Sequence, residues 1–443
     1  MMIQIKNRLL KYSAMLGICW LIVSSISASA QERLTLDGAI AKALLHNFDI
    51  QIAQNNVAQT TTNNTLGNAG FLPTVQGNGF YNFSSMNVKN QFSNGTTQER
   101  NGAISNNYGG GINAGITVFA AGKAYVVKKQ LTQLQALSEE QWKLQIQTTI
   151  SQVIQAYAQL VLQRQQIMAI DTALSLAKIR MTLSEMKYAS GLSAKVDFLQ
   201  ARVDYNTRQS DSLRLVGTTQ DMFADLNYLM GEDPYKQYLI DDSLSFHQKI
   251  EPQQKEILLQ NNLSVSIAQR DWEVARLGAK AAKLSLLPSL DWTTGYNYNK
   301  TQSQSGFALF NQSLGFTTGL TLNIPIFNAG NLSRASKIAS LQALQNEIRY
   351  EKQHTEIARQ YRRAWSAYTI SHSAYQLEQQ NIAFAKENLD IQKARFRAGL
   401  ATTIETREAE NSYVTAMVRL YNAAYNLKLS ETRVLELDNK LVE

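Results

Sequence analysis

The sequence predicts a membrane β-sheet joined to long α-helices, built as a tandem duplication whose four strands close into a barrel only in an oligomer. Three observations support this fold class. The five prolines leave residues 74–233 and 326–443 free of proline, which suits long helices because a proline inside a helix costs about 3 kcal/mol. Four segments alternate apolar residues with small or polar ones, as strands of a membrane barrel do. The two halves of the chain also carry the same motifs in the same order.

Composition limits the classes of protein that the chain can be. Of its 443 residues, 44% are hydrophobic and 18% are charged, which argues against disorder. A mean hydropathy of −0.25 argues against a bundle of transmembrane helices. The formal net charge of +8 is spread along the chain, without a cluster of Lys and Arg among aromatic residues, so we expect no nucleic-acid partner. The four histidines lack ligand spacing, so we expect no metal, no cofactor and no enzymatic activity.

The first 30 residues read as a secretory signal peptide. Basic residues precede an apolar run at 15–23, which is too short to span a bilayer, and small residues lead up to Ala30. We therefore predict cleavage after Ala30. The single cysteine, Cys19, follows Ile18, which is larger than the small residue that a lipoprotein processing site requires. The mature protein is expected to carry no lipid anchor.

The duplication is visible at two pairs of segments. FLPTVQ at 71–76 resembles LLPSLD at 286–291, and KYASGLSAKVDFLQAR at 187–202 resembles RFRAGLATTIETREAE at 395–410. Self-similarity of this kind indicates that one structural unit occurs twice. The expected domains are the signal peptide over 1–30, repeat 1 over 31–230, a connector over 231–251 and repeat 2 over 252–443.

Each repeat reads as helix, strand, loop, strand, long helix, turn and helix. In repeat 1 these elements are expected over 35–70, 71–83, 84–107, 108–119, 123–188, 188–193 and 194–230. In repeat 2 they are expected over 252–286, 287–299, 300–313, 314–327, 331–396, 396–401 and 402–438.

The strands are predicted from their alternation and the long helices from their apolar spacing. In 287–299 the even positions include Leu290, Trp292 and Tyr296, whereas small or polar residues occupy the odd positions. A soluble sandwich with one buried face would give a similar pattern in any single segment, but four such segments flanked by long helices favour a membrane sheet. From 124 to 188 apolar residues recur at spacings of three and four, as in a coiled-coil seam.

The predicted lengths suggest a rod of antiparallel helices, with a strand hairpin at one end and a helical hairpin at the other. Each long helix has about 66 residues and so extends about 100 Å. The two shorter helices of each repeat, stacked end to end, can run beside it. Four strands cannot close a membrane barrel, and open strand edges are not tolerated in lipid, so the chain must oligomerise. Two copies would supply eight strands and three would supply twelve.

Taken in this order, the motifs resemble the TolC family of outer-membrane efflux ducts. The resemblance covers nearly the whole mature chain. It rests on Leu-Pro at each first strand, on F-x-x-G at 119–122 and 327–330, and on an aromatic residue followed by x-x-Gly-Leu at 188–192 and 396–400. It implies a homotrimer in the outer-membrane lipid of a Gram-negative bacterium, with a twelve-stranded barrel and a coiled-coil tunnel across the periplasm. It also implies a passive exit duct for tripartite efflux or type I secretion, whose partners are a periplasmic adaptor protein and an inner-membrane transporter.

Two glycine turns are the candidate adaptor-docking tips. Gly191 and Gly399 permit the positive φ that a tight helix-to-helix turn requires, and Leu192 and Leu400 follow them. Small residues near these turns would let a helical hairpin of the adaptor approach. The alternative is that both turns are simple loops without a docking role.

Three acidic residues are candidates for a periplasmic gate. Asp197 and Glu405 each lie six residues after a tip glycine, and Glu408 follows one turn after Glu405. In the family, acidic residues at the positions of Glu405 and Glu408 face the lumen, and such a ring of carboxylates favours cations. The alternative for Glu405 is a capping box with Thr402 at the start of the last helix.

The chain departs from the family gate at two positions. A tyrosine and a basic residue of the family are replaced by Phe396 and Ala401, so the family's closing network cannot be carried over. Two other classes of protein compete with the duct. A trimeric coiled-coil surface or structural protein would need neither a duplicated tip nor four strands, and a periplasmic enzyme would need a catalytic constellation that the sequence lacks.

Overall fold

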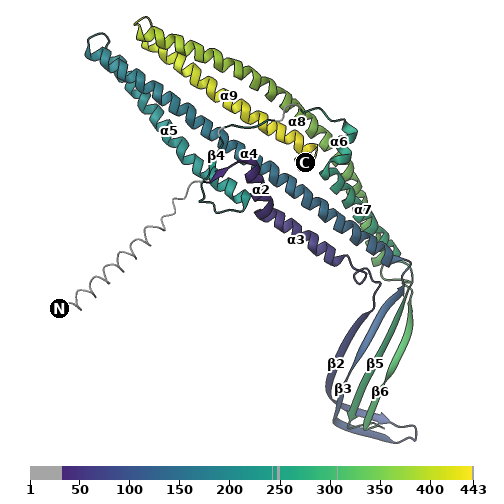
Figure 1. The fold of residues 1–443 in the computed structure, drawn as a ribbon. Coiled ribbons are helices and arrows are strands. Elements are labelled where there is room, and N and C mark those ends of the chain that lie inside the picture. The colour runs from purple at the N-terminus through teal and green to yellow at the C-terminus, as the bar shows by residue number, and fades with distance from the viewer. Residues whose placement is uncertain (1–31, 242, 247–249, 307, 442–443) are drawn as a thin grey trace, which may run out of the picture. The chain divides into compact units, whose positions relative to one another are not determined.

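The structure is a computed structural model that describes residues 32–241, 243–246, 250–306 and 308–441 (Figure 1). The predicted signal peptide, its cleavage after Ala30 and the cysteine lie outside the described residues. In the part of the chain that is described, no helix combines the length and the apolar character that crossing a membrane would require.

The chain forms two compact units. Unit 1 contains the segments up to Leu45, Gln152–Phe246 and Ser371–Leu429, and unit 2 contains His46–Ser151, His247–Ile370 and the segment from Ser430. Each unit therefore combines parts of both sequence repeats, because the long helices continue from one unit into the other.

The elements follow one another as in the predicted repeat, with two short strands added. In order they are β1 (Arg33–Leu34), α2 (Leu36–His46), α3 (Phe48–Asn63), β2 (Thr74–Gln91), β3 (Thr97–Phe119), α4 (Lys123–Ala189), α5 (Lys195–Met230), β4 (Leu239–Ile240), α6 (Lys255–Asn261), α7 (Leu263–Leu284), β5 (Ser289–Ser303), β6 (Phe310–Asn323), α8 (Asn331–Arg397) and α9 (Thr403–Leu437). The two long helices, α4 and α8, have 67 residues each.

Both leading helices are divided, contrary to the prediction of one helix over 35–70 and one over 252–286. The residue at each break is a buried asparagine, Asn47 or Asn262. Its Oδ1 accepts hydrogen bonds from the backbone N–H groups two and three residues later, at 3.0 to 3.3 Å. Asparagine is preferred at such N-caps because its side chain satisfies N–H groups that have no partner within the helix.

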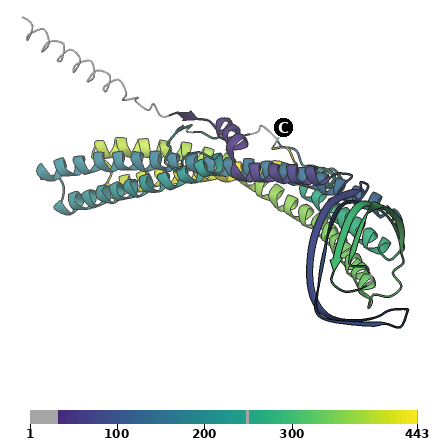
Figure 2. The same ribbon diagram turned by 90° about the horizontal axis from the view of Figure 1, so that it is seen from below.

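Four antiparallel strands form one sheet in unit 2, in the order β2-β3-β5-β6, and the ribbon shows them curved (Figure 2). Most of 84–107, predicted as a loop, instead continues the pairing of β2 with β3. The predicted loop over 300–313 likewise contributes to both β5 and β6. Polar side chains do not interrupt this pairing, because the ladder forms between backbone groups. Strand β6 ends before the predicted residue 327, since Pro325 has no N–H to donate.

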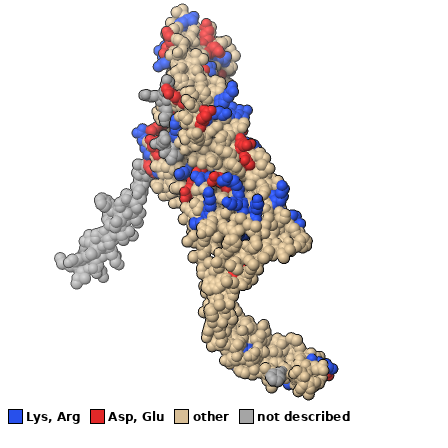
Figure 3. Space-filling model, turned by 90° about the vertical axis from the view of Figure 1, so that its right-hand side faces the viewer, with Lys and Arg blue, Asp and Glu red and all other residues tan. Residues whose placement is uncertain are grey.

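The two faces of this sheet differ in chemistry. By register, one face carries large apolar side chains that are exposed, namely Val75, Tyr81, Ile112, Trp292, Tyr296, Leu314, Phe316 and Leu320. The opposite face carries Asn, Thr and Gly joined across strands. Asn113 donates to Asn78 at 2.7 Å, and Asn297 donates to Asn113 at 3.1 Å. On the side of the sheet that Figure 3 shows, charged side chains are few.

The core of unit 1 surrounds β1 and β4, which pair in parallel. Tyr157 of α4 is buried there with Leu34, Leu226 and Met230. Its hydroxyl donates to the Leu34 carbonyl at 3.1 Å. The packing joins the start of the described chain to α4 and α5.

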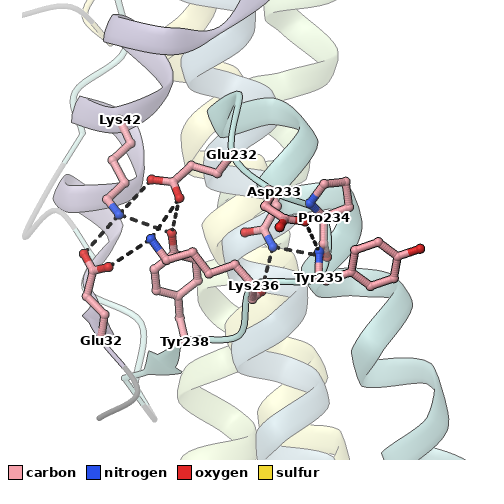
Figure 4. A network of polar contacts seen from close by, with 9 residues as sticks. Glu32, Lys42, Glu232, Asp233, Pro234, Tyr235, Lys236 and Tyr238 are labelled. Carbon is pink, nitrogen blue, oxygen red and sulfur yellow. Dashed lines mark hydrogen bonds and ion pairs between the residues drawn. The ribbon is translucent and has the colours of Figure 1, made fainter. Parts of the chain in front are cut away.

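A polar network holds the connector next to α2 (Figure 4). Lys42 Nζ donates to Glu32 and to Glu232, both at 3.0 Å. Lys236 Nζ lies 2.9 Å from Glu232 and 3.1 Å from Glu32, and the Tyr238 hydroxyl donates to Glu232 at 2.9 Å. Donation by Lys236, together with the other two donors, lowers the pKa of Glu232 to about 2.

Candidate functional site: the two helical hairpin tips

The first tip joins α4 to α5 by a tight turn centred on Gly191. The residue has φ +76°, a conformation that side chains with a Cβ rarely adopt. Its N–H donates to the Tyr188 carbonyl at 3.0 Å, and the N–H of Leu192 donates to the Lys187 carbonyl at 2.8 Å. This pair of hydrogen bonds is a Schellman motif, which closes the C-terminus of a helix.

The second tip joins α8 to α9 in the same way. Gly399 has φ +77°, its N–H donates to the Phe396 carbonyl at 3.2 Å, and the N–H of Leu400 donates to the Arg395 carbonyl at 2.8 Å. Figures 1 and 2 show both tips at the same end of unit 1. The duplication therefore produces two equivalent turns side by side in one unit.

Both tips present apolar side chains to solvent. Leu192 is 80% exposed and Leu400 is 71% exposed, and Val196 and Ile404 one turn further on are also exposed. Exposed apolar groups at a turn gain nothing from water, so they suit a surface that a partner covers.

The three predicted gate acids lie at or near the start of the helices that leave the tips. Glu405 closes a capping box: its Oε2 accepts from the N–H and the hydroxyl of Thr402 at 2.6 and 2.8 Å, and the Glu405 N–H donates to the Thr402 hydroxyl at 3.2 Å. These two donations from Thr402, the backbone one first, lower the pKa of Glu405. Asp197 is partly buried and accepts from Ser193 Oγ at 2.8 Å. Glu408 is exposed.

Phe396 lies in the packing of the second tip. It is buried, and Lys187 Nζ lies 4.1 Å from its ring centroid. A phenyl ring has no hydroxyl to donate, so this position holds the hairpins together by packing and a cation–π contact.

A buried ion cluster behind the tips was not predicted from the sequence. Arg180 of α4 is 5% exposed. Its NH2 donates to Asp204 Oδ2 of α5 at 3.0 Å, and its NH1 lies 2.9 Å from Glu410 Oε2 of α9 without hydrogen-bond alignment. Arg407 approaches Asp204 at 3.8 Å. One guanidinium thus joins both hairpins.

The sequence feature that indicates this cluster is a charged residue, Arg180, at an apolar seam position of α4. Leu176, Arg180 and Leu183 follow one another at spacings of four and three, the seam spacing of α4. Leu176 packs with Leu389 and Ala409 from the second hairpin. Burial raises the pKa of Glu410, against the opposing effect of the Arg180 charge. A charge at a buried seam position requires partners on the facing helices.

The sequence matches a family model over most of its length. The model is that of the outer membrane efflux protein family, and it matches residues 39–232 and 256–440. The chain belongs to this family. The result confirms the TolC-family resemblance that the motifs predicted.

Cation efflux system protein CusC of Escherichia coli strain K12 is similar to this chain, with 24% identity over 88% of this chain and 83% of CusC. Proteases secretion protein PrtF of Dickeya chrysanthemi is 18% identical and covers 91% and 88%. Outer membrane protein TolC of Vibrio cholerae is 23% identical over 59% of this chain, and the chain spans 60% of its length.

Solved structures share the fold. The Campylobacter jejuni CmeC outer membrane channel superimposes with a TM-score of 0.79 at 18% identity, covering 91% of this chain and 85% of CmeC. A crystal structure of CusC superimposes with a TM-score of 0.74 at 22% identity, covering 91% of both chains.

Proposed function

We propose that this protein is the exit duct of a tripartite efflux or type I secretion system, a passive conduit across the outer membrane and the periplasm. Membership of the outer membrane efflux protein family supports this function. Its relatives include both a cation efflux protein and protease secretion proteins. The proposed partners are a periplasmic adaptor protein and an inner-membrane transporter, and the signal peptide is proposed to be cleaved after Ala30 without addition of a lipid anchor.

The observation that carries this proposal is the two-faced sheet. Its exposed apolar face suits lipid, and its face of hydrogen-bonded Asn and Thr suits a water-filled lumen. In the described chain, β2 and β6 each pair on one side only. Lipid does not tolerate open edges, so β2 of one copy is proposed to pair with β6 of the next. Three copies then give a barrel of about twelve strands.

The tips are proposed to serve two roles at the periplasmic entrance. Gly191, Leu192, Gly399 and Leu400 form the adaptor-docking surface, supported by the exposure of both leucines. Asp197, Glu405 and Glu408 line the gate, where three-fold symmetry would place the carboxylates in a ring that favours cations.

Conductance in planar lipid bilayers tests the duct. The purified protein should insert and give stable ion-conducting steps, whereas a structural coiled-coil protein would give none. The Glu405→Gln and Glu408→Gln double variant should lose part of its cation preference, because glutamine at position 405 can still accept the capping hydrogen bonds but carries no charge. Unchanged cation preference would exclude these residues from the gate.

Crosslinking or co-purification with the pump tests the docking surface. Leu192→Glu and Leu400→Glu should weaken adaptor binding, because each places a charge on an apolar contact surface. Leu213→Glu is the matched control, since Leu213 is an equally exposed leucine on α5 away from the tip. Equal adaptor binding by the tip variants and the control would make the tips simple loops.

A further inference from the structure

One lysine interrupts the apolar face of the sheet. Lys300 of β5 pairs with Tyr108 of β3 and Gln312 of β6, and by this register its side chain shares the face of Tyr296 and Leu314. Among the paired residues of β2, β3, β5 and β6 that lie between the register shifts, Lys300 is the only charged residue on that face. A charge on a lipid-facing surface is costly at mid-depth and tolerated near the headgroups.

Aromatic rings flank the lysine on two sides. Its Nζ lies 5.5 Å from the centroid of the Tyr108 ring and 5.2 Å from that of the Phe310 ring. Tyr81 on β2 continues the row, with its ring centroid 6.5 Å from that of Tyr108. Such contacts attract an ammonium without neutralising it, so the rings position a cation that keeps its charge.

The distance from Leu290 to Lys300 along β5 indicates that Lys300 and its neighbouring aromatic rings lie at the level of the lipid headgroups. From Leu290 to Lys300 the strand rises about 33 Å, at about 3.3 Å per residue. A tilt of about 40° converts this to a height of about 25 Å, the height of the lipid-facing band of an outer-membrane barrel. Leu290 lies near the strand end that follows α7, so Lys300 lies at the opposite rim of the band.

Lys300 has no carboxylate partner among the residues that the structure describes. Lys89 on β2 differs, because it forms an ion pair with Glu99 on β3. We propose that Lys300, held between Tyr108 and Phe310, binds the phosphate of a membrane-lipid headgroup at the rim of the barrel away from the helices. The inference rests on the proposed function, since it requires the sheet to lie in a membrane. A compact ammonium at the interface is the group that attracts an anionic headgroup.

Lipid retention tests the site. The full mature chain, purified in detergent, is mixed with phosphatidylglycerol or phosphatidylcholine, and retained lipid is measured by native mass spectrometry. The wild type should prefer phosphatidylglycerol. Lys300→Gln should weaken that binding about fivefold per site, the factor for one lysine near an anionic surface, and Lys300→Arg should retain it. Lys89→Gln is the matched control, because its lysine already has a carboxylate partner.

Two results would overturn the inference. One is equal phosphatidylglycerol retention by Lys300→Gln and the wild type. The other is full displacement of the lipid by inorganic phosphate at equal concentration, which would mean a free-phosphate site. Conductance of the same preparations distinguishes failure of the lipid site from failure of the proposed duct. If the wild type conducts while Lys300→Gln retains lipid normally, only the lipid site is wrong. If the wild type does not insert into bilayers, the duct and the lipid site both fail.

Discussion

Replacing Arg180 by methionine should loosen the contact between the two helical hairpins. The substitution removes a cation that is 5% exposed and leaves the buried Glu410 facing it without a contacting charge. Breaking a buried pair from one side typically costs about 3 to 5 kcal/mol. We expect the lower value, about 3 kcal/mol, because Arg407 stays 3.8 Å from Asp204 as a second cation.

Hydrogen exchange measures this loss locally, which avoids the irreversible unfolding common in large assemblies. A local cost of about 3 kcal/mol corresponds to amide exchange about a hundredfold faster in the facing turns of α4 and α9. Arg214→Met is the matched control. Arg214 is exposed and pairs with Asp211 on the same helix at 3.6 Å, and a surface pair of this kind is worth less than about 1 kcal/mol.

Substitution of Glu410 and the pH dependence of exchange test the role of Arg180 in two further ways. Adding Glu410→Gln to Arg180→Met should restore part of the protection, because no unpaired carboxylate then remains at that position. The loss of protection should also shrink as the pH falls, since burial raises the pKa of Glu410 and protonation then removes its unpaired charge. Exchange rates in Arg180→Met within threefold of the wild type, at neutral pH, would refute the proposed role of the arginine.

Three other substitutions or titrations test separate features. Asp438 is buried, its pKa is raised to about 6 by burial, and its carboxylate oxygens accept no hydrogen bond in the described chain. Asp438→Asn should therefore stabilise unit 2 at pH 7 by about 1 to 3 kcal/mol. Amide hydrogen exchange at increasing denaturant concentration measures this gain. The pKa of Glu232 is lowered to about 2, so this residue should stabilise the connector fully above about pH 4.5 and lose that contribution as the pH falls toward 2. The rate of hydrogen exchange at the Leu239 amide measures the change. Gly111→Val should disrupt the sheet, because a Cβ there would lie 2.7 Å from the Tyr296 carbonyl oxygen; circular dichroism of the purified variant should show loss of strand signal.

Elements set by local pattern were predictable, and elements that depend on buried side-chain hydrogen bonds were not. The alternation in β5 predicted its apolar face, because the side-chain period of a strand is independent of its neighbours. The breaks at Asn47 and Asn262 depended on burial of each amide in the folded unit. In sequence alone, an asparagine within a polar helix is equally compatible with an exposed position.

In the candidate site, the tip turns could be predicted from the sequence, whereas the Arg180 cluster could not. The tip turns were predictable because Gly191 and Gly399 each recur at the same place in a duplicated motif, and a left-handed residue after a long helix has few alternatives to glycine. The Arg180 cluster draws one partner from the next helix, α5, and another from α9, which is far away in sequence. Its seam position marked it as buried, but only the three-dimensional arrangement of the helices identifies which carboxylates meet it.

The capping and gate roles of Glu405 are compatible, and their combination makes a prediction. Carboxylates gathered in a ring raise one another's pKa and so lose charge as the pH falls. The N–H and hydroxyl of Thr402 act in the opposite direction and lower the pKa of Glu405, so the capping box should keep the ring charged. Thr402→Ala removes the hydroxyl and keeps the carboxylate. In planar bilayers this variant should lose its cation preference at a higher pH than the wild type, and in a Glu405→Gln background the same substitution should cause no such shift. An identical pH profile for Thr402→Ala and the wild type would mean that Glu405 caps its helix without contributing charge to the lumen.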